Sequence, residues 1–354
     1  MEHPTRIFVD TSKSVFQVHG VNAAEAVVIR RKQSRSQFAK FLSALEPTVI
    51  GFEACGASHH WARVAMAHGH QARLVPPQHV KRYLERNKND ARDAEAGCEA
   101  MSRPRTTFVP VKSEEQQAAG MLIGVRQGLV RRRTQLSNTI RGYAAEFGLV
   151  SPKGADKIGP LLERIAADMT LPALARAMFA ELGGEWAQVV ARVAQVEQRL
   201  LSSHKADPTR VRLAEVPSIG PVGAAMIVAK VTDAAAFKST RHFSGWVGLT
   251  PKDHSTAGKQ RLGAITKAGD EALRAVLVSG AMSLVKVAQK RPDKAWPWLV
   301  DLLQRKSPKA AAVAVANRVG RIVCKMLVTG EAYDPQRMMR PPGRSPLQPI
   351  AQAA

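Results

Sequence analysis

The chain has 354 residues, of which 52 are Lys or Arg and 29 are Asp or Glu, and its formal net charge at pH 7 is +23. Few soluble metabolic enzymes carry such an excess, so a polyanion, above all nucleic acid, is the expected partner. With 45% apolar residues the chain is able to bury several hydrophobic cores, which excludes intrinsic disorder as the main state.

Membrane and disulfide signals are absent from the sequence. No apolar run approaches the roughly 18 residues of a membrane span, and the first residues lack the basic and apolar regions of a secretory signal. The three cysteines are widely spaced and form no CxxC pair, which argues against a disulfide framework and a zinc knuckle. We therefore expect no membrane association and a cytoplasmic protein with reduced thiols.

Strand and helix patterns alternate in the first 75 residues. Branched or alternating apolar segments between polar turns predict strands at residues 5–10, 14–20, 26–30, 48–52 and 72–75. Helical apolar spacing predicts helices at 36–45 and 59–68. The first three strands follow one another through short turns, as antiparallel strands do. This order predicts a mixed sheet flanked by helices.

The rest of the chain reads as helical. A pattern without proline runs over residues 114–149, a length typical of an arm or a coiled coil, and residues 156–201 continue it with an expected break at Gly183 and Gly184. The fold class predicted is α/β plus all-α. Its predicted parts are an α/β domain at 1–111, a helical coiled-coil arm at 112–205, a mostly helical C-terminal domain at 206–334 and a disordered, basic tail at 335–354.

Four carboxylates suggest a metal site in the first part. Asp10 and Glu53 stand at the ends of predicted strands, while Asp90 and Asp93 are three residues apart and share one helix face. Such oxygen ligands suit paired Mg²⁺ or Mn²⁺ ions in phosphoryl transfer. Taken singly, Asp10 also fits a turn, Glu53 a salt bridge and Asp90 a helix N-cap. Their joint placement in a ribonuclease H-like strand order favours the metal site.

Two segments of the C-terminal part are typical of phosphate binding. LAEVPSIGPVGAA at 213–225 has the form of a helix-hairpin-helix whose turn, with Ser218 and Gly220, would offer backbone N–H groups to a phosphate; an ordinary helical hairpin is the alternative. The stretch 246–269 is rich in Gly, hydroxyl groups and Lys. A hydroxyl there is able to attack phosphorus while cations stabilise the developing charge, although a passive phosphate-binding loop fits equally well. The cations are Lys259, Arg261, Lys267 and Arg274.

Arginines also stripe the long predicted helix. They are Arg126, Arg131, Arg132 and Arg133. We expect them to contact the backbone of RNA or DNA, since phosphates dominate the affinity of such contacts.

Together these motifs resemble the DEDD transposases of insertion sequences, recombinases that act with an element-encoded guide RNA. The matching segments are FVDTSK at 8–13, GFEA at 51–54, KNDARDA at 88–94 and KQRLG at 259–263. The resemblance spans about residues 5–334. It implies a resolvase-like, ribonuclease H-like domain in which Asp10, Glu53, Asp90 and Asp93 form the metal site.

The resemblance also implies a nucleophilic serine that forms a covalent link to DNA. We expect Ser255, with Thr256 as the alternative, because the chain reads STAG where the family often has SSG or STG. The four acids and this serine would act at one phosphate, and the ester would let strands be rejoined without ATP. The implied partners are donor and target DNA, a structured noncoding guide RNA and further copies of the chain in a dimer or tetramer, with nucleoid association when DNA is bound.

Two other functions remain open from the residues. In a resolvase-type metal nuclease the acids would activate water and Ser255 would only bind phosphate. In a non-catalytic nucleic-acid-binding protein the acids would be structural, and binding would be sensitive to salt.

Overall fold

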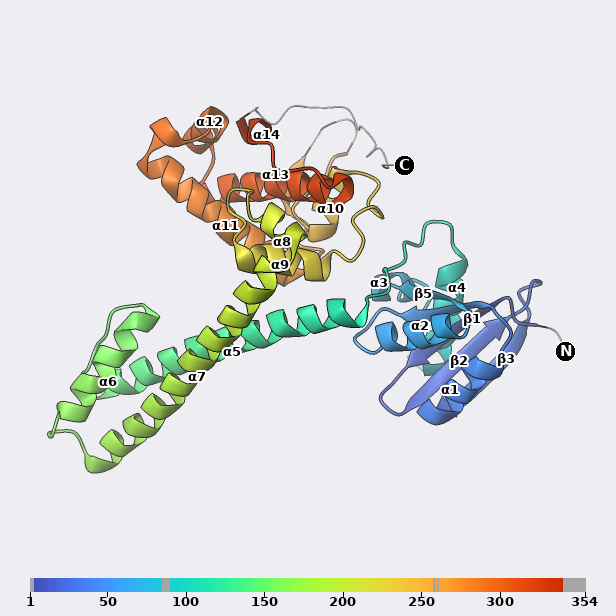
Figure 1. Ribbon diagram of the computed structural model, residues 1–354, viewed down its shortest axis with the longest axis horizontal. Helices are drawn as coiled ribbons and strands as arrows, with labels where there is room; N and C mark the ends of the chain where they lie inside the picture. The colour runs from blue at the N-terminus through green and yellow to red at the C-terminus, as the bar shows by residue number, and fades with distance from the viewer. Residues whose placement is uncertain (1–2, 85–89, 257–258, 260, 340–354) are drawn as a thin grey trace. The chain divides into compact units, whose positions relative to one another are not determined.

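The computed structural model describes residues 3–84, 90–256, 259 and 261–339 (Figure 1). Contacts divide the chain into two compact units, Met1–Gln116 and Gln117–Ala354. The first unit is built on a sheet, and the second is mostly helical. None of the described helices combines the length and the apolar content that a bilayer-spanning helix requires.

A five-stranded mixed sheet forms the centre of the first unit. Its strands are β1 (Arg6–Thr11), β2 (Val15–Val21), β3 (Val27–Ser34), β4 (Val49–Glu53) and β5 (Gln71–Val75), in the spatial order β3-β2-β1-β4-β5. The first three strands are antiparallel neighbours, whereas β4 runs parallel to both β1 and β5. The five strands and the mixed sheet predicted from the sequence are confirmed.

Helices cover both faces of this sheet (Figure 1). On one face lie α1 (Arg35–Ala44) and α2 (Ser58–Ala67), and on the other lie α3 (Pro77–Val80) and α4 (Asp90–Ser102). A strand covered on both sides is apolar on both sides. In β1, Ile7 and Val9 therefore pack with α1 and α2, while Phe8 packs with α4. Because side chains alternate along a strand, Asp10 lies on the same side as Phe8.

Glycines let α4 approach the sheet closely. A Cβ atom built on Gly97 of α4 would lie 2.1 Å from the ring of Phe8 in β1. In the same way, a Cβ atom on Gly51 of β4 would lie 2.6 Å from the Sδ atom of Met101. These two contacts, from a helix to two central strands, fix α4 on the face toward which Asp10 points.

A helical arm begins the second unit. Its two long helices, α5 (Glu114–Glu146) and α7 (Ala173–Lys205), have 33 residues each and are therefore about 50 Å long. They are antiparallel, since Arg126 of α5 pairs with Glu197 and Arg132 pairs with Glu185. The short helix α6 (Ile158–Ala167) packs on the end of the arm (Figure 1).

The expected helix break at Gly183 and Gly184 is wrong. Helix α7 continues through both glycines, and the chain turns earlier, between α6 and the N-terminus of α7 at Pro172. A Cβ atom on Gly183 would touch Leu162 of α6 at 3.4 Å. Packing of α6 against α7 thus overrides the low helix propensity of glycine.

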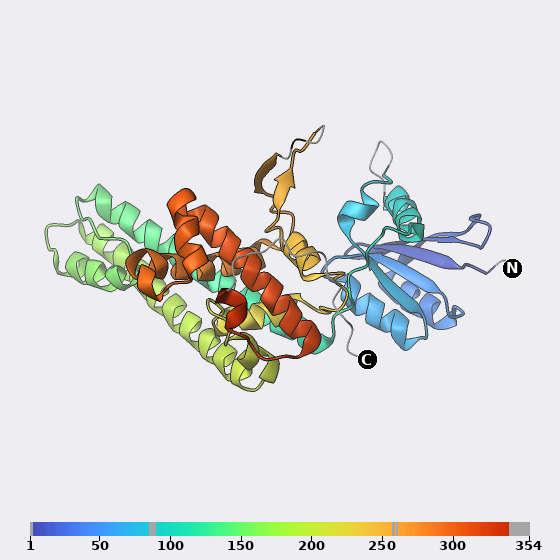
Figure 2. The same ribbon diagram turned by 90° about the horizontal axis from the view of Figure 1, so that it is seen from above.

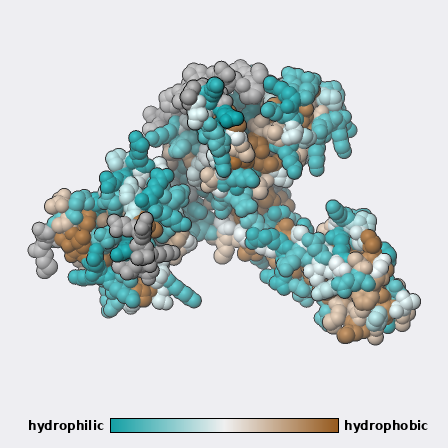
Figure 3. Space-filling view, turned by 180° about the vertical axis from the view of Figure 1, so that it is seen from behind, coloured by the Kyte–Doolittle hydropathy of each residue, from teal (hydrophilic) through white to brown (hydrophobic). Residues whose placement is uncertain are grey.

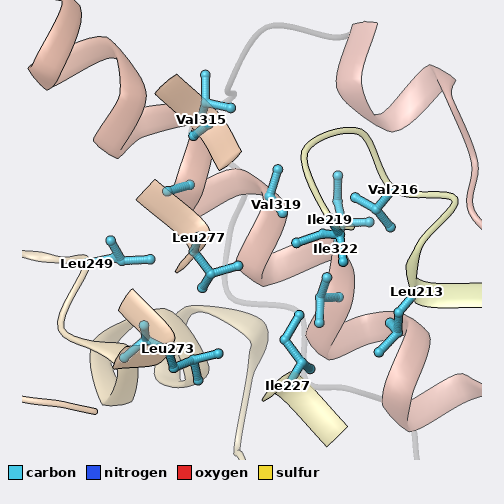
Figure 4. Packing of buried hydrophobic residues seen from close by; sticks show 14 of the residues in the cluster. Leu213, Val216, Ile219, Ile227, Leu249, Leu273, Leu277, Val315, Val319 and Ile322 are labelled. Carbon is cyan, nitrogen blue, oxygen red and sulfur yellow. The ribbon is translucent and has the colours of Figure 1, made fainter. Parts of the chain in front are cut away.

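The remaining helices enclose one large hydrophobic core. They are α8 (Pro208–Leu213), α9 (Pro221–Lys230), α10 (Thr240–Val247), α11 (Glu271–Lys290), α12 (Pro297–Arg305), α13 (Pro308–Thr329) and α14 (Gln336–Met339). Figure 4 shows Leu277 of α11 and Val319 of α13 inside this core, together with Ile219 from the turn before α9.

A two-stranded hairpin interrupts the helices of the second unit. Strands β6 (Pro251–Asp253) and β7 (Leu262–Ile265) are antiparallel and stand out from the helices (Figure 2). The sequence indicated only a glycine- and hydroxyl-rich stretch here, because each strand is short and neither is buried.

Only the start of the tail predicted to be disordered, 335–354, is described. There α14 forms one helical turn, which differs from the expectation, because the indole Nε1–H of Trp298 donates a 2.7 Å hydrogen bond to the carbonyl of Met338. Residues 340–354 lie outside the described part of the chain.

Candidate active site

Two of the four predicted carboxylates are neighbours on the sheet. Asp10 and Glu53 stand one residue beyond the last paired positions of the parallel strands β1 and β4, so the register places them side by side. Adjacent strands are about 4.8 Å apart. The strand ends do stay together, since Thr11 Oγ1 lies 3.6 Å from Cys55 Sγ. Both carboxylates are half-buried and extend from the face that α4 covers.

Asp93 contributes a buried oxygen on α4. Its Oδ1 atom is shielded from solvent and has no hydrogen-bond partner among the described residues. Buried carboxylate oxygens are nearly always paired, so an orphaned one fits a cation ligand. Asp90 is the first residue of the same helix, but its side chain lies outside the described part of the structure.

The complete set of four acids stays a prediction. Among the side chains that the structure describes, no three His, Cys, Asp or Glu residues form a metal-binding group. The structure thus joins Asp10 with Glu53 and gives Asp93 an unsatisfied oxygen. A divalent metal suits these hard oxygen donors.

Ser255 lies in the exposed part of the β6–β7 hairpin. Its backbone N–H donates a 2.9 Å hydrogen bond to Asp253 Oδ1, and its Oγ accepts a 3.0 Å bond from the N–H of Arg261. The hydroxyl oxygen of Ser255 therefore accepts from a backbone amide while it remains exposed, and the carboxylate binds the backbone N–H of the same residue. Its alternative, Thr256, is also exposed, and its carbonyl accepts a 3.0 Å bond from the N–H of Lys259.

Asp253 is a neighbour that the sequence analysis missed. Hydrogen bonds from the side chain and the backbone N–H of Ser255 hold the pKa of Asp253 below its ordinary value, so this carboxylate is ionised at neutral pH. The signal in the sequence is the Asp-x-Ser spacing, because an Asp side chain readily accepts a bond from the N–H two residues ahead.

The cations expected around the serine fall into two groups. Lys259 and Arg261 are exposed in the same hairpin as Ser255. Lys267, also exposed, lies beyond β7 with a left-handed φ of 55°. The side chain of Arg274 instead binds the backbone, since its Nη1 donates hydrogen bonds to the carbonyls of Val247 and Gly269 at 3.1 and 3.2 Å.

The turn between α8 and α9 packs against α11. Ser218 has a φ of 80°, and a Cβ atom on Gly280 of α11 would lie 2.2 Å from the Ser218 carbonyl oxygen. The Oγ of Ser218 is buried and has no partner among the described residues, whereas Gly220 is exposed and precedes α9. Phosphate binding at this turn stays a prediction.

The four arginines of the arm differ in their partners. Arg126 and Arg132 form ion pairs across the arm with Glu197 and Glu185, with Nε to Oε1 distances of 3.0 and 3.1 Å. Arg131 and Arg133 have no ion pair within the described ranges. The charges of Arg131 and Arg133 are therefore less neutralised than those of Arg126 and Arg132. Contact between the four arginines and nucleic acid stays a prediction.

Comparison with known proteins identifies the family of both units. Residues 8–147 match the family model DEDD_Tnp_IS110, described as a transposase, and residues 211–296 match the model of the transposase IS116/IS110/IS902 family.

Whole-chain relatives agree with these matches. The putative transposase y4pF/y4sB of Sinorhizobium fredii is 53% identical over 94% of this chain and 86% of its own length. A probable family 20 transposase of Pseudomonas aeruginosa is 43% identical over 94% of this chain and 99% of its own length. The transposase for insertion sequence element IS1111A of Coxiella burnetii is 34% identical over 92% of this chain and 90% of its own length. The chain therefore belongs to the IS110 family of transposases, enzymes that cleave and rejoin DNA.

Proposed function

We propose that the chain moves an insertion sequence by cleaving DNA through a covalent ester on Ser255. The observation that supports this most is the exposed Ser255 hydroxyl, whose oxygen accepts a hydrogen bond from the N–H of Arg261 and which lies beside the ionised Asp253 carboxylate. Lys259 and Arg261 extend from the same hairpin and supply positive charge for a phosphate.

The proposed step is a displacement at phosphorus. The Oγ–P bond forms, the bond from phosphorus to the leaving deoxyribose oxygen breaks, and the serine proton passes to water while the leaving oxygen is protonated. The cations of the hairpin stabilise the charge that develops on the phosphoryl oxygens. Because the ester keeps the free energy of the original phosphodiester, a hydroxyl of a second strand reverses the step without ATP.

The acids of the first unit would hold the divalent ion. The resolvase-like, ribonuclease H-like assignment is supported by the strand order β3-β2-β1-β4-β5, by the adjacent Asp10 and Glu53, and by the orphaned oxygen of Asp93. Asp90 is the fourth proposed ligand. When bound, Mg²⁺ or Mn²⁺ stabilises negative charge on the reacting phosphate. Both residue sets, acids and serine, are proposed to serve this one reaction.

A guide RNA and further copies of the chain are the other proposed partners. The net charge of +23 suits RNA and DNA together. For self-association, the end of the arm offers apolar side chains, including Val150, Met169 and Leu174, which are 72–73% exposed. Figure 3 shows apolar residues gathered there, at its lower right. A large exposed apolar patch is typical of an interface.

Covalent trapping tests the proposed function. Purified protein, its flanking noncoding RNA and labelled DNA are incubated with Mg²⁺, and the products are separated under denaturing conditions. We expect a protein–DNA adduct that Ser255→Ala and Asp90→Ala abolish and Thr256→Ala retains. Cleavage that persists in Ser255→Ala and Thr256→Ala, with no adduct in any lane, would instead establish a hydrolytic metal nuclease. Binding that is indifferent to all three changes, with no cleavage by the unaltered chain, would indicate a non-catalytic protein.

Asp253→Asn is expected to slow adduct formation by about tenfold, since Ser255 loses the charged acceptor that holds its backbone N–H and orients its side chain. DNA binding should not weaken. Because the folded-state pKa of Asp253 is depressed, this contact persists at neutral pH and is lost only as pH falls through the lowered pKa. The rate of trapping measured between pH 6 and 8 should therefore show the same ratio of variant to unaltered chain throughout. A ratio that approaches one within this range would contradict the assigned role.

A further inference from the structure

A pocket of about 570 Å³ lies in the second unit at the base of the hairpin. Its wall is formed chiefly by α13, with contributions from α10, α12 and α14. Pro251 and Ile265, which pair at the base of β6 and β7, also line it. The volume falls within the range of small-molecule and cofactor sites, about 300–1,000 Å³.

Two arginines of α13 extend into this pocket with incomplete partners. Arg318 donates through Nε to the carbonyl of Arg337 at 3.0 Å, while its Nη1 is buried without a hydrogen-bond partner among the described residues. Its guanidinium carbon lies 5.1 Å from the ring centre of Trp298. Within the part of the chain that the structure describes, Arg321 has one long hydrogen bond, 3.5 Å from Nε to Thr240 Oγ1.

No carboxylate compensates these two charges within the described part of the chain. The nearby Glu331 is engaged by Lys325 and Arg337, which also line the pocket. Burial lowers the pKa of Arg318, and repulsion from Arg321 lowers it further. Burial also lowers the pKa of Arg321, with Arg241 adding to the effect. Like charges that are partly buried and held close together are stabilised by an anion.

Much of the remaining wall of the pocket is apolar. Leu249, Val313 and Ile322 line it beside Pro251 and Ile265. A concave site with an apolar wall and a guanidinium pair suits one nucleotide, whose base has an apolar face and whose phosphate is anionic. A duplex has its bases stacked inside and offers no single nucleotide to such a pocket.

We propose that this pocket binds one unpaired nucleotide of a DNA strand, with its phosphate on Arg318 and Arg321 and its base against the apolar wall. Ser255 follows Pro251 by four residues, at most about 14 Å of extended chain. The nucleotide therefore belongs to the strand that Ser255 cleaves, a point that rests on the proposed function, whereas the binding itself does not.

Fluorescence anisotropy with the full chain tests the pocket. The probe is a labelled single-stranded oligothymidine, without divalent metal and in the Ser255→Ala background. We expect Arg318→Gln combined with Arg321→Gln to weaken binding by about tenfold and to lower the slope of log affinity against log salt by about 0.7 for the one phosphate lost. The matched control is Lys286→Gln, an exposed cation on α11, which should change neither quantity appreciably.

A second variant keeps both arginines and fills the pocket. Ala314→Phe places a ring in the space lined by α13 and should weaken single-strand binding while leaving duplex binding unchanged. Equal losses for single strand and duplex, in either variant, would show a general phosphate surface and overturn the nucleotide pocket. Unchanged single-strand affinity in both variants, with unfolding temperatures preserved, would overturn it as well. Neither outcome depends on covalent adduct formation, so failure of the serine mechanism is detected separately.

Discussion

Asp93→Asn is expected to lower DNA cleavage by on the order of 10³-fold, because the substitution removes a charged oxygen that would ligate the divalent ion. The same change should raise the stability of the metal-free protein by about 1 kcal/mol, since it relieves a buried carboxylate oxygen that has no described partner. Cleavage assays and thermal unfolding, each with and without Mg²⁺, measure the two effects. Mg²⁺ should raise the unfolding temperature of the unaltered chain and have no such effect on the variant.

A metal ligand and a structural acid are distinguished by the effect of Asp93→Asn on stability. If Asp93 is a ligand, the substitution lowers cleavage but raises the stability of the metal-free protein. A structural Asp93 would lose stability on substitution, and its loss of activity would follow from unfolding. The control is Asp301→Asn, which changes an exposed aspartate of α12 and should affect neither measurement. If Asp93→Asn destabilises the metal-free chain, the assignment of this residue to a metal site is wrong.

Gly97→Ala is expected to destabilise the first unit by about 2 kcal/mol, even though alanine is the better helix former. The added Cβ atom would lie 2.1 to 2.4 Å from three ring atoms of Phe8, whose side chain is 1% exposed and has no room to move. Helix α4 must then shift from β1, and it carries Asp93 with it. Hydrogen exchange of the β1 amides measures the loss, and cleavage should fall in parallel.

Gly124→Ala is the matched control for this prediction. The glycine lies in α5, where an added Cβ atom has no neighbour within 4 Å among the described residues. The substitution should therefore stabilise the helix by up to about 1 kcal/mol. If the β1 amides were equally protected from hydrogen exchange in Gly97→Ala and Gly124→Ala, the close packing of α4 on Phe8 would be contradicted.

Local pattern was enough to predict the elements of the sheet. The apolar run Ile7-Phe-Val9 belongs to a strand covered on both faces, and the short turns after it leave β2 and β3 as its antiparallel neighbours. The pairing of β1 with β4, which brings Asp10 beside Glu53, links segments more than 40 residues apart. No local pattern encodes this pairing; the sequence indicated it only through the expected strand order.

Packing and backbone hydrogen bonds explain what the sequence did not predict. Gly183 reads as a helix breaker, and only the contact with Leu162 shows why α7 continues through it. Arg318 and Arg321 line a pocket only because α10 and α14 pack near α13. The apolar periodicity of the sequence does not predict this packing. Asp253 escaped notice because its role depends on the hairpin that brings Arg261 back to Ser255.

The two parts of the carboxylate site differ in their expected tolerance to mutation. The spacing of Asp10 and Glu53 is set by the backbone ladder between β1 and β4, so changes of side-chain volume beneath them should leave it intact. Asp93 depends on how α4 rests on the ring of Phe8, so a change of one methyl group at that contact displaces it. Substitutions that accumulate in the core should therefore displace Asp93 first, while Asp10 and Glu53 keep their positions in copies that no longer transpose.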